Sequence, residues 1–393
     1  MDSLIKTMSC GCANHALEVL GKSISEDGPD IWAEHESPFI RRIVELFTQR
    51  GLARTAKIQE ELAAWLSGKR STHAAQVQRP GFAPAWTADD LGLVKIYLEA
   101  LPENAWQLED YDYLIQYLVQ RYMPAGAIMS DAEWLAVRSN FMGKAQVYFG
   151  GDFSAAHADA LIAALPLTVY DAVKTFTPSM AARQVLEYGR LRAAENVVAL
   201  ADSARHALKA TVIEHMSRAM QGDPAATPAV LKQKLFDNFS AMNRDWRRIA
   251  LTEAGEMANQ GMIAALDPGT QVKRLEEYKG ACGFCKKIDG RVFNVVSPDD
   301  PDKNGETDVW PGKTNVGRSA SPRKKTENGL ELREPEEMWW PAAGVQHPHC
   351  RGIWTKVEKL SEGVDPKFEA FIRRTFGVKE GVRLDEWSSR HRT

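Results

Sequence analysis

The sequence predicts an α+β fold, in which a mainly helical N-terminal half is followed by a small α+β domain. Two observations carry this prediction. Helical periodicity with capping residues fills most of the chain up to residue 266, and short β-like runs follow it, around a group of cysteine and histidine residues. The length of 393 residues allows two or three domains. We expect a helical region at 1–170, a second domain at 171–360 and a C-terminal basic tail at 361–393.

The N-terminal region reads as helices joined by short turns. A Ser-Pro pair at 37–38 supplies a helix cap and a proline at the first helical position, and apolar residues then recur on one helical face. Thr87 is expected to cap a second helix that ends near residue 102. The sequence SDAE at 130–133 fits a capping box, which predicts that another helix begins there.

The second half begins with long helices and then changes character. Residues 179–220 are rich in Ala, Leu, Arg and Glu and predict one long helix or two nearly continuous ones. A Thr-Pro pair opens a further helix to about residue 266. Short strands are then expected at 272–278, 291–296 and 352–357.

A polar segment at 297–337 interrupts this second domain. It contains five prolines and four glycines, which predict an exposed insertion loop with little core of its own. Arg323, Lys324 and Lys325 within it could contact DNA or another partner, although a basic run of three residues is more often only solvated. The Trp-Trp-Pro sequence at 339–341 is expected to anchor the loop on the core.

The composition narrows the class of protein. Lys and Arg number 49 against 52 Asp and Glu, a net charge of −3, which excludes a generally basic, histone-like nucleic-acid binder and permits local basic patches. The longest weakly polar stretch, 155–173, is interrupted by polar residues and a proline, so we expect no membrane partner. The odd number of cysteines, five, does not suggest a disulfide framework.

Three cysteines and a histidine have the spacing of a metal site. Cys282 and Cys285 form a CxxC pair whose sulfurs can reach one tetrahedral ion, and the sequence HPHC at 347–350 supplies further ligands. Cys350 with either His347 or His349 completes a Cys₃His set, which suits Zn²⁺ and leaves no open position, so the site would be structural. We prefer His347, because His349 is the immediate neighbour of Cys350, and place His349 next to the ligands.

The gap between the two halves of this site does not argue against it. Sixty-four residues separate Cys285 from Cys350. Closing that loop costs roughly 1.3 kcal/mol more than closing a 15-residue loop. Structural zinc contributes on the order of 10 kcal/mol in small domains.

Other interpretations of the same residues remain open. Cys282 and Cys285 could be a redox pair or only buried thiols. Cys10 and Cys12 with nearby His15 could chelate a metal but lack a fourth ligand, so thiols without a metal, or an exposed reactive pair, are favoured. Glu253 and Glu256 could form a carboxylate pair, but such residues usually face water or pair with nearby arginines, here Arg247 and Arg248. No catalytic signature is found, and we expect the protein not to be an enzyme.

The order of the motifs resembles the phage Mu F-like head morphogenesis, or minor capsid, proteins. The resemblance covers about 179–357 and lies in the sequence RIALTE at 248–253, NQG at 259–261, the CGFC pair followed by Ile-Asp-Gly, and HPHCRG at 347–352. It supports His347 as the ligand and places His349, Asp289 and Arg351 beside the site. Two features depart from the family pattern: Leu251 stands where an arginine often precedes Thr-Glu, and the polar segment is longer than usual.

The resemblance implies a minor head protein of a tailed phage or prophage. Such a protein would act in head morphogenesis near the portal, with the portal protein, the scaffold or major capsid protein and packaged DNA as partners, and with a role in DNA packaging or ejection. It would be found in the capsid interior of the virion, and in the host cytoplasm during assembly. Two alternatives remain: a zinc-supported nucleic-acid-processing enzyme with His349 as base, and a DNA-binding module without catalysis.

Overall fold

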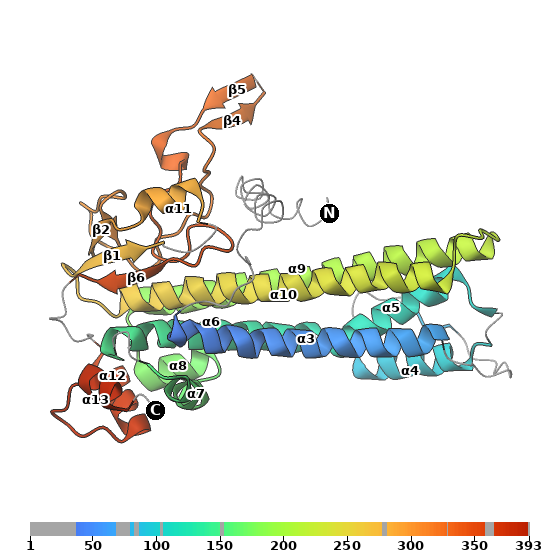
Figure 1. The fold of residues 1–393 in the computed structure, drawn as a ribbon, viewed down its shortest axis with the longest axis horizontal. Helices are drawn as coiled ribbons and strands as arrows, with labels where there is room; N and C mark the ends of the chain where they lie inside the picture. The colour runs from blue at the N-terminus through green and yellow to red at the C-terminus, as the bar shows by residue number, and fades with distance from the viewer. Residues whose placement is uncertain are drawn as a thin grey trace. The chain divides into compact units, whose positions relative to one another are not determined.

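A computed structural model describes residues 37–67, 79–81, 86–102, 105–149, 153–276, 281–327, 329–357 and 365–391 of the chain. Helices dominate, and a small mixed sheet lies in the C-terminal part, which agrees with the predicted α+β class (Figure 1). Cys10, Cys12 and His15 fall outside the described residues.

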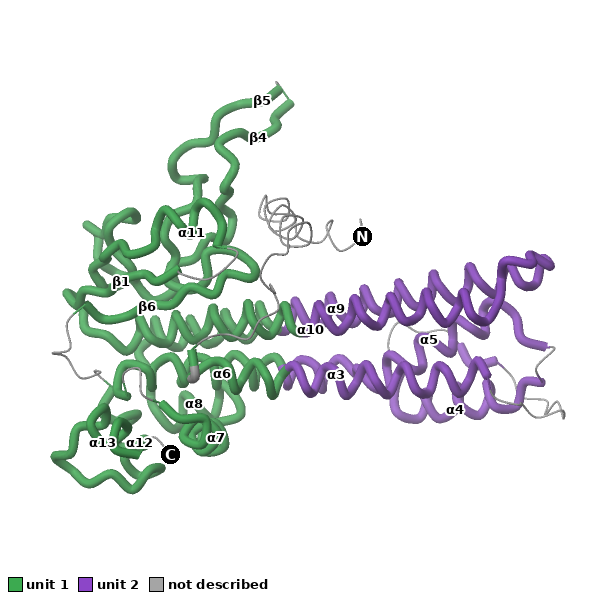
Figure 2. The backbone as a smooth tube through the Cα atoms, in the orientation of Figure 1, with its two compact units in different colours: residues 1–47, 132–193, 247–393 green, residues 48–131, 194–246 purple. Residues whose placement is uncertain are grey.

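The chain divides into two compact units that are not contiguous in sequence (Figure 2). Unit 1 comprises 1–47, 132–193 and 247–393, and unit 2 comprises 48–131 and 194–246. Four helices contribute residues to both units: α3 (Pro38–Ser67), α6 (Ala125–Phe149), α9 (Met180–Met220) and α10 (Pro228–Ala264). Each unit therefore combines segments that lie far apart in the sequence.

Unit 2 is helical and includes α4 (Ala88–Ala100) and α5 (Leu108–Tyr122). As predicted, Thr87 caps α4, in a capping box with Asp90. The carboxylate of Asp110, which is 1% exposed, accepts bonds from the Tyr97 hydroxyl (2.6 Å) and from Arg79 Nη2 (2.9 Å). This network satisfies a charge that burial would otherwise penalise.

The predicted helix start at 130–133 is wrong. Helix α6 already begins at Ala125, and the carbonyl of Pro124, the residue before it, accepts the amide of Ile128 (3.1 Å). The carboxylate of Glu133 instead accepts the amide of Val169 (2.8 Å), at the start of another helix. Glu133 therefore bonds to a residue far away in the sequence and not to the start of its own helix.

The helical part of unit 1 is built around aromatic side chains. Helices α7 (Ala155–Ala164) and α8 (Val169–Phe176) lie here with α12 (Pro366–Phe376) and α13 (Leu384–Arg390). The rings of Phe141 and Phe368 are 5.3 Å apart, and those of Phe149 and Phe376 are 5.5 Å apart. The described part of the expected basic tail, 365–391, therefore forms helices with a buried apolar face.

Helices α6 and α10 meet within unit 1 at two glycines. A Cβ atom at Gly143 would overlap the backbone carbonyl of Ala258, and one at Gly261 would overlap that of Asn140. The amide group of Asn140 donates to the carbonyl of Met257 (3.3 Å) across the same contact. Only glycine permits the two backbones to approach this closely.

The sheet has the strand order β3-β2-β1-β6. Strands β1 (Gln271–Leu275), β2 (Val292–Val295) and β6 (Ile353–Lys356) lie where the sequence predicted strands, and their pairs are antiparallel. The short strand β3 (Asp308–Val309) runs parallel to β2. Met262 and Ile263 near the end of α10, and Leu266 just after it, share a core with the sheet residues Phe293 and Trp354.

The polar segment 297–337 is more ordered than the exposed loop that we expected. Its first part surrounds Lys313, which is 1% exposed and donates from Nζ to the carbonyls of Gly305 (2.6 Å) and Asp308 (2.7 Å). Trp310 and Trp340 place their rings 4.7 and 4.8 Å from the same nitrogen. The two carbonyls and two tryptophan rings form a cage around the Lys313 side chain, and these contacts hold the first part of the polar segment in a defined structure.

The second part of the segment is the exposed one. It forms a hairpin of β4 (Arg323–Thr326) and β5 (Gly329–Leu332), followed by the short 3₁₀ helix η2 (Pro335–Glu337). The hairpin lies apart from the four-stranded sheet (Figure 1).

Candidate metal centre

The CxxC pair sits on the first turn of a short helix, α11 (Gly283–Ile288), that follows β1. Cys282 is the residue before the helix, and its Sγ accepts the backbone N–H of Cys285 (3.4 Å). Both side chains are buried. The helix start therefore fixes two sulfurs side by side and turns them inward.

The other ligands come from the turn at 347–350. The amide group of Gln346 bonds both the backbone N–H (2.9 Å) and the carbonyl (3.1 Å) of Ala342, which closes the preceding turn. Nδ1 of His347 lies 2.7 Å from the carbonyl of Pro348, so the opposite ring nitrogen is the one that faces the sulfurs. Trp339 stacks on the imidazole at 5.7 Å, which places the predicted Trp-Trp-Pro anchor against the site.

The four predicted residues come together in two overlapping groups that share Cys285, one with Cys282 and His347 and the other with Cys350. His347 Nε2 lies 3.3 Å from Sγ of Cys282 and 3.3 Å from Sγ of Cys285. In a zinc tetrahedron, with bonds of about 2.0 Å to nitrogen and 2.3 Å to sulfur, such atoms lie about 3.5 Å apart. Cys350 lies within 4.8 Å of Cys285. The cluster is therefore compatible with a metal site.

Electrostatics also favours a cation. The bond with Cys285 and the proximity of His347 lower the pKa of the Cys282 thiol to about 2. Although burial opposes ionisation of Cys350, its bond with Cys285 and the charge of Arg274 lower its pKa well below the ordinary value. The sulfurs of Cys282 and Cys350 in turn raise the pKa of Cys285. The three buried sulfurs thus resist becoming thiolates together, unless a cation lies among them.

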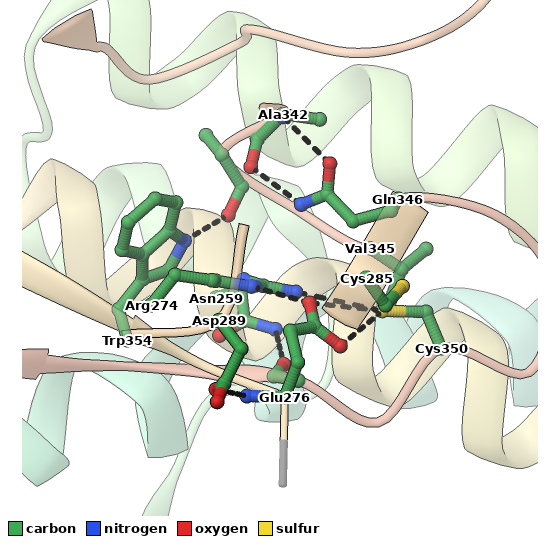
Figure 3. Close-up of polar contacts among 12 residues, drawn as sticks. Asn259, Arg274, Glu276, Cys285, Asp289, Ala342, Val345, Gln346, Cys350 and Trp354 are labelled. Atoms are coloured by element: carbon green, nitrogen blue, oxygen red, sulfur yellow. Dashed lines mark hydrogen bonds and ion pairs between the residues drawn. The ribbon is translucent and has the colours of Figure 1, made fainter. Parts of the chain in front are cut away.

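A buried ion pair that the sequence analysis missed lies against Cys350 (Figure 3). Arg274 Nη2 donates to its sulfur at 3.5 Å, and both carboxylate oxygens of Glu276 are also 3.5 Å from it. Arg274 Nε donates to Glu276 at 2.7 Å. Burial raises the pKa of Glu276 to about 7. The sequence did contain a signal for the burial of Arg274. Side chains alternate between the two faces of a strand, so Arg274 lies on the same buried face of β1 as Val272.

The residues expected beside the site take different positions. The Asp289 carboxylate accepts the amide of Glu276 (2.6 Å) and so joins the end of β1 to the end of α11. His349 adopts a left-handed conformation with φ of +69°, and its amide donates to the hydroxyl of Thr252 (3.1 Å) on α10. Burial lowers the pKa of His349 to about 3. Arg351 is half-buried, and its charge contributes to that lowering.

The sequence analysis favoured water or a nearby arginine as the partner of Glu253 and Glu256. In the structure both side chains are buried. They are 1% and 2% exposed, and both pair with Arg192 on α9, at 3.2 and 3.3 Å. Helix α9 therefore supplies the cation that pairs with these two buried carboxylates.

Glu256 also connects this ion pair to the metal centre. Its Oε2 accepts the backbone amide of Val345 at 2.8 Å, two residues before His347. Gln260 donates to its other oxygen (3.1 Å). Glu256 is therefore a positioning residue for the turn that carries two of the candidate ligands.

The three basic residues of 323–325 lie on β4 of the hairpin, outside the Cys/His cluster. The Nζ of Lys324 donates to both oxygens of Glu337, at 2.9 and 2.8 Å. Of the three, Lys324 is thus the one that is engaged in an ion pair within the described residues.

No family model matches the chain, and comparisons with curated proteins and with solved structures found no match either. Among the described helices, none is long and apolar enough to cross a membrane.

Proposed function

We propose that the Cys/His cluster holds a structural Zn²⁺ ion and that the chain is a minor head protein of a tailed phage or prophage. In this proposal it acts in head morphogenesis near the portal and in DNA packaging or ejection. The observation that carries the proposal is a buried Cys₃His cluster built from the CGFC and HPHC motifs, in the order that is typical of the Mu F-like proteins. The portal protein, the scaffold or major capsid protein and DNA are the proposed partners.

The donor set favours zinc over other divalent ions. Three sulfurs and one imidazole are soft ligands, whereas Mg²⁺ and Ca²⁺ prefer oxygen. When bound, the ion supplies a crosslink between the first turn of α11 and the turn at 347–350. With four protein ligands no position is left for water or substrate, so its role would be to hold the domain together.

The zinc proposal is tested by replacing Cys350 with serine in the full chain. We expect C350S to lose bound zinc, as measured by elemental analysis, and to expose the amides of β1 and β6 to hydrogen exchange. The matched control is Cys10→Ser, a cysteine that the proposed ligand set does not include, which should keep the zinc content of the wild type. Full zinc content and unchanged exchange in C350S would contradict the proposal.

The head-protein proposal is tested by quantitative mass spectrometry of DNA-filled particles from an induced lysate of the source host. We expect a few copies per particle, and crosslinks from this chain to the portal protein. Absence from both filled particles and empty procapsids would contradict the proposal, whatever the zinc analysis gives.

The enzyme alternative is less well supported. A nuclease that uses His349 as a general base would need a ring nitrogen with a pKa near neutrality, whereas burial lowers the pKa of His349 to about 3. The test is incubation of the protein with plasmid and oligonucleotides in the presence of Mg²⁺ or Zn²⁺. Cleavage that is lost in His349→Ala would favour this alternative over the structural role.

A further inference from the structure

The hairpin of β4 and β5 exposes two leucines on one face. Leu330 and Leu332 are 70% and 72% exposed. In the antiparallel register, Lys325 lies opposite Leu330 and Arg323 lies opposite Leu332, so these four side chains share one face. We call these four residues the hairpin face. It carries an apolar stripe along β5 and a basic stripe along β4.

The charges of this face are not compensated within the hairpin. Lys324 and Glu331 lie opposite each other on the other side, and Lys324 also pairs with Glu337. Among the residues that the structure describes, neither Arg323 nor Lys325 forms an ion pair. The hairpin face therefore presents two positive charges beside two exposed leucines.

The base of the hairpin is well held. Ser319 forms an isolated bridge with Met338, and Arg318 Nη1 donates to the carbonyl of Met338 (2.8 Å). The Arg318 guanidinium also lies 3.5 Å from the centre of the Trp340 ring. An isolated two-stranded hairpin is marginally stable in water, so these contacts at its base matter for presenting the face.

We propose that the hairpin face binds an acidic amphipathic helix of another protein. The separation of Leu330 and Leu332 along the strand, about 6.7 Å from the strand rise, is close to the rise of about 6 Å between residues i and i+4 of a helix. One apolar stripe of such a helix would cover the leucines, and acidic residues beside that stripe would face Arg323 and Lys325. This inference concerns a different surface from the metal centre and does not depend on the proposed function.

The two-stripe pattern favours a protein over a nucleic acid or a lipid surface. A phosphate backbone would be contacted by Arg323 and Lys325 alone and would leave both leucines exposed. A membrane-binding surface usually buries a larger apolar area than two side chains provide. Complementarity in both charge and apolar character is therefore met best by an acidic amphipathic helix.

The test uses the full chain and two labelled peptides of about 18 residues, long enough to form helix. Both carry leucines at i and i+4 spacing, and one has glutamates where the other has lysines beside them. Fluorescence anisotropy should show that the glutamate peptide binds at least about tenfold more tightly than the lysine peptide. Equal affinities, or no binding of the glutamate peptide, would overturn the proposal.

Variants assign the binding to the hairpin face. Leu330→Ser with Leu332→Ser should weaken binding of the glutamate peptide about tenfold or more, and Arg323→Glu with Lys325→Glu should abolish the preference between the peptides. Glu331→Gln, on the opposite face, is the matched control and should bind as the wild type does. Because these side chains are exposed, all variants should keep the wild-type melting temperature. Unchanged peptide binding in both double variants would overturn the proposal.

The same variants distinguish other occupants of the face. Duplex DNA and phosphatidylglycerol vesicles are offered to the wild type and to the Arg323→Glu, Lys325→Glu variant, and sedimentation measures self-association of the leucine variant. If the glutamate peptide fails while one of these interactions depends on the hairpin face, that occupant replaces the helix and our proposal is wrong.

Discussion

Replacing Arg192 with methionine tests how the metal-bearing turn is held on the helices. Arg192 is the cation that pairs with Glu253 and Glu256, at 3.2 and 3.3 Å, and its side chain is 21% exposed, whereas the two carboxylates are 1% and 2% exposed. Methionine keeps much of the apolar volume but leaves two buried carboxylates without this partner. Breaking a buried ion pair by removing one member costs about 3 to 5 kcal/mol.

The assay is urea unfolding of the full chain, followed by circular dichroism at neutral pH. The matched control is Arg190→Met, two residues away on the same helix. It removes the ion pair of Arg190 with Glu187, whose side chains are 31% exposed for Arg190 and 41% exposed for Glu187. An exposed pair of this kind contributes below about 1 kcal/mol. We therefore expect R192M to lose several times more stability than R190M.

A rescue experiment separates the charge effect from lost packing. In the triple variant R192M/E253Q/E256Q the buried carboxylates become neutral amides, and the amide oxygen introduced at position 256 can still accept the backbone N–H of Val345. We expect this variant to recover at least about half of the loss. A stability of R192M within about 1 kcal/mol of R190M, or no recovery in the triple variant, would refute the reasoning.

Three further predictions concern packing, pH and metal removal. Gly261→Ala should lower the free energy of unfolding by about 1 to 3 kcal/mol in urea, because its Cβ overlaps the Asn140 backbone, whereas Gly92→Ala, at an open position of α4, should raise it by about 0.5 to 1 kcal/mol. Burial lowers the pKa of Lys313 to about 7. Between that value and the ordinary pKa near 10.5, the Lys313 amine is protonated in the unfolded chain but neutral in the folded one. As pH rises through this range, the stability of the wild type should therefore increase relative to that of Lys313→Met, by at most about 1.4 kcal/mol per pH unit. A gap in urea midpoints that stays constant from pH 7 to pH 10 would contradict this. Removing metal with a chelator should speed hydrogen exchange in β1 and β6 and leave α5 of unit 2 unchanged; equal effects on both would contradict a local role for the ion.

Several elements could be predicted because their signals are local. Thr87 caps α4 through its own side chain, and the strands β1, β2 and β6 lie within the runs that the sequence indicated. The helix start at 130–133 was wrong because the helix already begins at Ala125 and Glu133 bonds to Val169. A capping box cannot be distinguished by sequence alone from the same residues inside a helix.

The polar segment shows a second limit of sequence reasoning. Its composition indicated an exposed loop, yet Lys313 is buried there, because two carbonyls and two tryptophan rings surround its ammonium group. Such a cage depends on how residues 305–340 fold on themselves. Composition reports the presence of polar groups but not whether they satisfy one another.

The candidate site could be predicted in part, because ligand spacing is visible in sequence. The CxxC and HPHC motifs identified the four residues that the structure brings together. The partners around them were not visible. Arg192 lies 61 residues before Glu253, and Arg274 and Glu276 reach Cys350 only once β1 and the turn at 347–350 are packed together.

X-ray absorption at the zinc edge of the purified full chain tests the central claim most directly. It measures which atoms bind the metal, and the claim of a Cys₃His site predicts three sulfurs at about 2.3 Å and one nitrogen at about 2.0 Å. The alternative that the structure makes concrete is Glu276, whose carboxylate lies with Cys285 and Cys350 in a second group within 4.8 Å. An oxygen ligand in place of one sulfur, or a protein that binds no zinc, would contradict the closed structural site.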